Sequence, residues 1–106
     1  MNISEIKDPA FLQKLDEKQL RRLCRELREF IIENVSHTGG HLSSNLGLVE
    51  LTVALHRAFH SPEDKIIFDV GHQCYTHKLL TGRAAEFDTL RCIDGISGFQ
   101  CRSESP

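Results

Sequence analysis

The segment Lys65–Val70 constrains the fold of this chain more than any other stretch. It is short and mostly apolar, and it lies between a turn at 61–64 and Gly71. Such a run is typical of a strand that is buried on both faces of a parallel sheet. A parallel strand needs neighbours on both sides, and the sequence offers no second segment of this kind. We therefore expect an α/β fold with an incomplete sheet, mostly helical with one buried-type parallel strand.

Helical patterns account for most of the remaining sequence. Between Glu17 and Val35, apolar residues recur three and four positions apart, which predicts an amphipathic helix. Asp16 is its expected N-cap, and Gln19 occupies the capping-box position. A second helix is predicted over 45–60, with a buried stripe of Leu48, Leu51, Thr52, Leu55 and Phe59. Shorter helices are predicted over 73–80 and 84–90. The chain thus divides into a lead-in (1–15) that is extended apart from a short turn, a body of helices and strand (16–91) and a loop tail (92–106).

The charge balance argues against nucleic-acid binding. Lys and Arg total 13 and Asp and Glu total 15, which gives a net charge of −2 with neutral histidine. The arginines between 21 and 28 are interleaved with glutamates, a pattern of a solvated helix face rather than a phosphate-binding stripe. No apolar run approaches the roughly 18 residues that a membrane span requires. The first residues also lack the pattern of a secretory signal. We expect a cytoplasmic protein that binds neither nucleic acid nor membrane.

Cysteine and histidine spacing raises the question of a metal site. The four cysteines, at 24, 74, 92 and 101, form no Cys-x-x-Cys pair, so free thiols are expected. His56 and His60 are spaced so that both could lie on one helix face. No Glu or Cys follows them in a recognisable metal pattern, so two partly exposed helix histidines are the preferred interpretation. We assign no metal ligand, and a small metal-binding protein is the weaker alternative.

The first candidate site is the turn Ser36–Asn45 between the two longest predicted helices. Its glycine pair lets the backbone approach a ligand closely. The N-terminus of the following helix would present free N–H groups that favour an anion, with His41 beside it. A plain helix–helix turn with capping serines is the alternative, and spacing alone favours it.

The second candidate site is Asp69–Gln73, at the carboxyl end of the predicted strand. In open α/β sheets, ligands bind just outside that end. Gly71 permits a tight turn that would leave His72 at its lip, where a neutral imidazole can donate to a ligand oxygen or move a proton. Position alone leaves a ligand role and a structural role for His72 equally open. His77 and Lys78 follow about one helical turn later, either adding positive charge to the site or facing solvent.

These two clusters and the tail carry a family resemblance. The matching stretches are Thr38–Leu42 with 46–56, Asp69–Gln73 with 75–83, Gly95–Phe99 with 102–105, and the lead-in Ile6–Pro9. Together they resemble the N-terminal portion of 1-deoxy-D-xylulose-5-phosphate synthases, which are transketolase-like, thiamine-diphosphate-dependent enzymes. The resemblance covers nearly the whole chain. It departs at Thr76, where the family often has proline, and this puts only the local turn in question.

The resemblance implies a fold, a reaction and site residues. The fold is the N-terminal part, residues 1–106, of a transketolase-type pyrimidine/diphosphate-binding domain. The family condenses pyruvate with glyceraldehyde 3-phosphate, with loss of carbon dioxide, for isoprenoid and thiamine synthesis. Its cofactors are thiamine diphosphate and magnesium. His41 would face the reacting carbon as the catalytic residue, His72 would contact the cofactor, and Ser44 and Asn45 would lie near the same pocket.

The same resemblance implies that parts of the site lie outside this sequence. The family's Gly-Asp-Gly…Asn element, which holds magnesium and diphosphate, and its cofactor-activating glutamate are not found here. A magnesium ion without its carboxylate and carbonyl ligands is not held. We therefore do not expect this chain to bind the cofactor or catalyse alone. The expected partner is the remainder of the synthase or a second subunit, and uncovered apolar surface predicts self-association. The alternative is a non-catalytic remnant or interaction module of the same fold.

Overall fold

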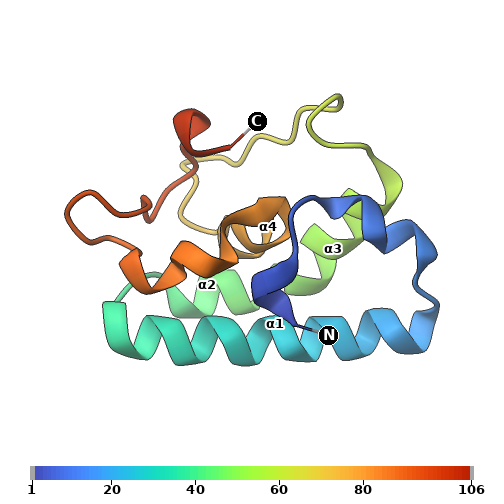
Figure 1. Cartoon of the computed structure of the whole chain (residues 1–106), viewed down its shortest axis with the longest axis horizontal. Coiled ribbons are helices and arrows are strands. Elements are labelled where there is room, and N and C mark those ends of the chain that lie inside the picture. The colour runs from blue at the N-terminus through green and yellow to red at the C-terminus, as the bar shows by residue number, and fades with distance from the viewer. Residues whose placement is uncertain (1, 106) are drawn as a thin grey trace.

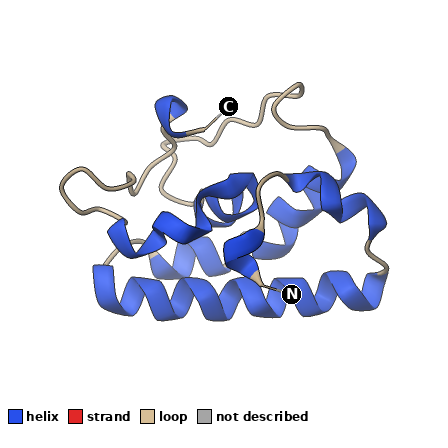
Figure 2. Cartoon of the chain, in the orientation of Figure 1, coloured by secondary structure: helices blue, strands red, loops and turns tan. Residues whose placement is uncertain are grey.

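The computed structural model describes residues 2–105 as helices joined by loops (Figures 1 and 2). Four α-helices are present in this range: α1 (Glu17–Thr38), α2 (Leu42–Leu46), α3 (Val49–Ala58) and α4 (Tyr75–Lys78). Short 3-10 helices form η1 (Ile3–Glu5), η2 (Pro9–Lys14), η4 (Ala84–Thr89) and η5 (Arg102–Glu104). A π-type turn, η3 (Leu79–Arg83), joins α4 to η4. The long helix α1 runs along one side of the molecule, and the shorter helices pack against it (Figure 1).

Helix α1 begins where its capping box predicts. The Asp16 carboxylate accepts the Gln19 backbone N–H at 2.8 Å, and the Gln19 side chain accepts the Asp16 N–H at 2.9 Å. This reciprocal pair is confirmed, and it satisfies two donors that the helix itself leaves open. The helix ends at Thr38, three residues beyond the predicted end, where Gly39 takes up a φ of 76°. The arginine face is solvated as predicted, with Arg21 and Arg22 paired to glutamates one turn away.

The core lies between α1 and the elements that cross it. Its fully buried side chains come from the lead-in, α1, α3, α4, η3 and η4, and include Leu12, Leu27, Ile31, Val49, Tyr75, Leu79 and Phe87. The lead-in is not extended but forms η1 and η2. It packs so closely that a Cβ on Gly82, at φ 97°, would lie 2.6 Å from the Lys7 carbonyl oxygen. Only glycine fits there.

The predicted strand is wrong: residues 2–105 contain no β-strand, and 65–70 is a loop. A strand exists only when another strand supplies peptide groups to its edge. Here the side-chain amide of Gln100 does this instead, accepting from the Phe68 N–H at 2.9 Å and donating to the Ile66 carbonyl at 2.7 Å. The run is not buried either, because Ile67 is 84% exposed. The described chain is therefore mostly helical, without the sheet of an α/β fold.

The second predicted helix is two helices rather than one. Gly47 and Leu48 interrupt it between α2 and α3, and α3 ends at Ala58 instead of His60. Glycine is a poor helix former, and the backbone leaves helical geometry at the next residue, Leu48, where φ is −113° and ψ is 9°. Val49, Thr52, Val53 and His56 are buried, whereas Leu51 and Phe59 of the predicted stripe are about half exposed. The Arg28 guanidinium of α1 forms an ion pair with Glu50, in the first turn of α3.

The predicted short helices and tail are close to their expected places. Helix α4 begins at Tyr75 rather than at 73, and the helix over 84–90 is the 3-10 helix η4. The tail is a loop apart from η5. No helix between residues 2 and 105 has the length and apolar character needed to cross a membrane.

Candidate functional site

The buried amide of Asn45 joins the two predicted clusters. Its Nδ2 donates to the carbonyl oxygens of His41, at 2.5 Å, and His72, at 2.8 Å. Its Oδ1 accepts the Tyr75 backbone N–H at 2.8 Å. Both amide hydrogens and the carbonyl oxygen are thus used within the chain, and only 1% of Asn45 is exposed. Asn45 therefore holds the turn after α1 against the turn before α4.

His41 is held by the phenol of Tyr75. The His41 backbone N–H donates to Tyr75 Oη at 3.1 Å, and His41 Nδ1 lies 3.2 Å from the same oxygen. Because Oη already accepts one hydrogen bond, its own hydrogen finds an acceptor if Nδ1 is unprotonated. This favours the tautomer with the proton on Nε2. Burial, and then the neighbouring His72 and Arg91, lower the pKa of His41, so its imidazole is neutral at neutral pH.

Gly40 is required for this contact. Its φ is 140°, and a Cβ at this position would lie 2.6 Å from Tyr75 Oη. A side chain here would push the phenol off His41. The glycine pair of the first cluster thus serves a close approach of backbone to Tyr75, a residue that the sequence analysis did not select.

His72 lies opposite His41. The two ring centroids are 5.4 Å apart, and the Phe99 ring lies 5.3 Å from His41 on another side. His72 follows a tight turn in which the Gly71 N–H donates to the Asp69 carbonyl at 2.6 Å. Gly71 has a φ of 95°, as the predicted tight turn requires. The structure therefore brings His41, Asn45 and His72 together.

Ser44 and the helix end at His41 fit the sequence expectation less closely. Ser44 is half-buried on α2, one residue before Asn45. The helix that follows His41 is α2, which has five residues, so few peptide dipoles align there. The anion site predicted at the N-terminus of a long helix accordingly lacks that helix.

A family model for 1-deoxy-D-xylulose-5-phosphate synthase matches residues 3–106, almost the entire chain. The chain belongs to the 1-deoxy-D-xylulose-5-phosphate synthase family. Curated synthases of that name are 59% identical over 99% of the chain in Geobacillus sp. and 61% identical over 97% in Caldanaerobacter subterraneus subsp. tengcongensis. The synthase from Ralstonia pickettii is 61% identical over 98%. The family resemblance stated from the sequence is confirmed.

The chain spans about one sixth of the length of these relatives, 16–17% in each case. The match lies in the N-terminal region of the synthase family. The chain therefore represents a small part of the synthases that it resembles.

A second histidine pair of this family member was not foreseen. His56 of α3 and His77 of α4 are 1% and 8% exposed, and His56 Nε2 lies 2.7 Å from His77 Nδ1. Burial lowers the pKa of His56 to about 4 and that of His77 to about 3, so both are neutral. The expectation of two partly exposed helix histidines is wrong for His56, while His60 is exposed. The available signal in the sequence was the spacing of Val49, Val53 and His56 at i, i+4 and i+7, which places His56 on the same helix face as two apolar residues.

The structure also bears on the cysteines, on metal binding and on Lys78. All four cysteines are free thiols, as predicted. Across residues 2–105, no group of three His, Cys, Asp or Glu side chains could hold a metal ion. Lys78, whose exposure the sequence left open, is fully buried and forms an ion pair with Glu104.

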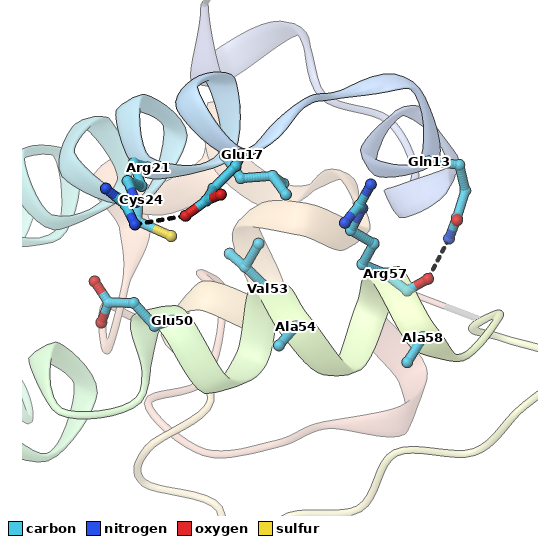
Figure 3. A pocket seen from close by; sticks show the side chains of 10 residues that line it. Gln13, Glu17, Arg21, Cys24, Glu50, Val53, Ala54, Arg57 and Ala58 are labelled. Carbon is cyan, nitrogen blue, oxygen red and sulfur yellow. Dashed lines mark hydrogen bonds and ion pairs between the residues drawn. The ribbon is translucent and has the colours of Figure 1, made fainter.

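A groove of about 610 Å³ lies between α1 and α3, away from the histidine site (Figure 3). Val53, Ala54 and Ala58 of α3 line one side of it. Its polar rim is largely paired, because Arg21 contacts Glu17 and the Gln13 amide donates to the Arg57 carbonyl at 2.5 Å. None of the predicted site residues lines this groove, so it does not belong to the site around His41 and His72.

Proposed function

We propose that this chain forms the part of a 1-deoxy-D-xylulose-5-phosphate synthase site that carries His41 and His72. It would contribute to the decarboxylating condensation of pyruvate with glyceraldehyde 3-phosphate in isoprenoid precursor synthesis. The main support is the Asn45 amide, which ties the backbones of both histidines together from within the core. Buried polar groups that are fully hydrogen-bonded fix one arrangement of the chain around them.

Each residue has a proposed role that follows from its surroundings. His41, with a neutral ring anchored at Nδ1, would orient the substrate or move a proton at Nε2. His72 would contact the cofactor. Asn45 has both amide hydrogens in use, so we propose that it positions the site and that Ser44 is the neighbouring cofactor contact.

The proposed cofactors are thiamine diphosphate and magnesium. When bound, the thiazolium ring of thiamine diphosphate supplies the carbanion for the carbon–carbon chemistry. The two imidazoles suit contacts to the organic part of such a cofactor. The residues described do not offer a metal centre, and magnesium is usually held by carboxylates together with substrate phosphates. We therefore propose that the remainder of a synthase, or a second subunit, supplies the metal and diphosphate ligands.

A chimera tests this proposal. This chain would replace the matching region of the Caldanaerobacter synthase, with which it is 61% identical over 103 residues. Product formation and calorimetric binding of thiamine diphosphate with magnesium would then be measured. We expect an active chimera, a loss of turnover on the order of 100-fold for His41→Ala, and weaker cofactor binding for His72→Ala.

His60→Ala is the matched control, because His60 is exposed and lies after the end of α3. It should leave both turnover and cofactor binding unchanged. A folded chimera that binds no cofactor would reject the catalytic role and support the non-catalytic remnant. A histidine variant with full activity would remove that residue from the site.

A further inference from the structure

The tail loop Ser97–Glu104 is tied to a buried lysine at both of its ends. Lys78 is fully buried, and its Nζ donates to the Ser97 carbonyl at 2.6 Å and to Glu104 Oε1 at 2.7 Å. The second carboxylate oxygen, Oε2, accepts the Ser97 backbone N–H at 2.7 Å. One ammonium and one carboxylate thus close the loop.

Arg83 adds a second cation to the same carboxylate. Its Nη1 lies 2.9 Å from Glu104 Oε1, and Arg83 itself is 5% exposed. Burial alone would raise the pKa of Glu104, but hydrogen bonds from Lys78 and the Ser97 N–H outweigh it and lower that pKa. Glu104 is therefore ionised at neutral pH. Removing its charge would leave two buried cations without their counter-ion, which is strongly unfavourable.

The closed loop forms one wall of the histidine site. Phe99 places its ring centroid 5.3 Å from that of His41. Gln100 lies against the turn before His72: a Cβ on Gly71 would be 3.0 Å from the Gln100 backbone nitrogen. The Gln100 amide also holds the 66–68 segment that leads into this turn. Figure 1 shows the C-terminal segment passing beside this part of the chain.

We infer that Glu104 is a positioning residue of the His41–His72 site. It touches neither histidine. Instead, through Lys78, Arg83 and the Ser97 backbone, it fixes the loop so that Phe99 covers His41 and Gln100 supports the turn before His72. A role of Glu104 in catalysis rests on the proposed function. Its role in fixing the loop can be tested on this chain alone.

The test uses the 106-residue chain without cofactor or substrate, by nuclear magnetic resonance. Glu104→Gln should speed hydrogen exchange at the Ser97 amide by about tenfold or more, because a hydrogen bond to a charged group is lost. It should also raise the pKa of His41 toward its ordinary value, because Phe99 no longer shields the ring from water. The matched control is Glu86→Gln on η4, an exposed glutamate, which should change neither quantity.

A second variant keeps the inference testable if Glu104→Gln does not fold. Phe99 is 45% exposed, so Phe99→Ala removes the ring without touching the buried ions. It should raise the pKa of His41 and leave the Ser97 amide exchange unchanged. An unaltered His41 titration in Phe99→Ala, or in a folded Glu104→Gln, overturns the inference. Neither measurement depends on the chimera, so failure here and failure of the proposed function are distinguishable.

Discussion

The two histidine pairs of this chain differ in burial and in how their rings are held. In each pair, one histidine comes from the α2–α3 region and the other from residues 72–77. The rings of His41 and His72 are 5.4 Å apart and half-buried. Those of His56 and His77 are stacked at 4.9 Å, buried, and hydrogen-bonded to each other. The first pair keeps access for a ligand, whereas the second is part of the core.

The difference shows what separates a site histidine from a structural one. The outer pair is held through backbone groups, by Asn45 at the carbonyls and Tyr75 at the His41 N–H. On the ring of His41, Nδ1 contacts Tyr75 Oη at 3.2 Å, which leaves Nε2 available for chemistry. The inner pair is held through one ring nitrogen of each histidine, His56 Nε2 and His77 Nδ1, and both rings are buried, so they serve the core. The predictions that follow test this contrast, beginning with the largest expected effect.

Asn45→Ala should lower the free energy of unfolding more than any of the other variants. It removes three hydrogen bonds, two to part-buried carbonyls and one from a buried N–H. We expect a loss of about 3 kcal/mol or more in the free energy of unfolding, measured by urea titration. Asn34→Ala is the control, because Asn34 makes a local bond to the Phe30 carbonyl, one turn earlier in α1. Its expected cost is about 1 kcal/mol or less. Equal losses of unfolding free energy in the two variants would show that Asn45 does not hold the two turns together.

The inner pair should make stability depend on pH. Burial lowers the pKa values of His56 and His77 from 6.5 to about 4 and about 3 in the folded state. The unfolded chain therefore takes up protons first as the pH falls. The stabilising contribution is complete above pH 6.5 and is lost as the pH falls toward 4 and 3. Urea midpoints measured across this range should fall steadily.

The variant His56→Leu/His77→Leu isolates this effect, since it keeps apolar volume and removes both titrating groups. Its urea midpoint should vary less between pH 6.5 and 4 than that of the unchanged chain. His60→Ala, which removes an exposed histidine, should keep the full dependence. An unchanged pH profile in the double variant would mean that other groups cause it.

What could be predicted from the sequence was mainly what a segment determines by itself. The capping box of Asp16 and Gln19 was predicted because each partner lies within one helical turn. The predicted strand at 65–70 was wrong because a strand depends on peptide groups from another strand, and here the Gln100 side chain forms two of these hydrogen bonds instead. An apolar run records a preference for burial, not the presence of a neighbouring strand.

The site residues likewise divide into those that a local sequence pattern predicts and those that depend on long-range contacts. His41 and His72 could be proposed from glycine-containing turns and from the family resemblance. Tyr75 and Phe99 could not, because their contacts with His41 join residues far apart in the sequence. Glu104 could not, because it acts through the distant cations Lys78 and Arg83. His56 was misjudged for a related reason, because packing against the rest of the chain decides which face of α3 is buried. That face carries His56, whereas Leu51 and Phe59 of the predicted stripe are about half exposed.

The smallest effect on stability should come from His41→Ala. Its ring is half-buried, and the alanine backbone N–H can still donate to Tyr75 Oη. We expect a loss below about 1 kcal/mol in urea unfolding, against about 2–4 kcal/mol for His56→Ala, which opens a space in the core. A residue whose loss lowers turnover in the chimera on the order of 100-fold but hardly affects folding is retained for chemistry. If His41→Ala destabilises the chain as much as His56→Ala does, the outer pair is also structural, and the contrast between the two pairs fails.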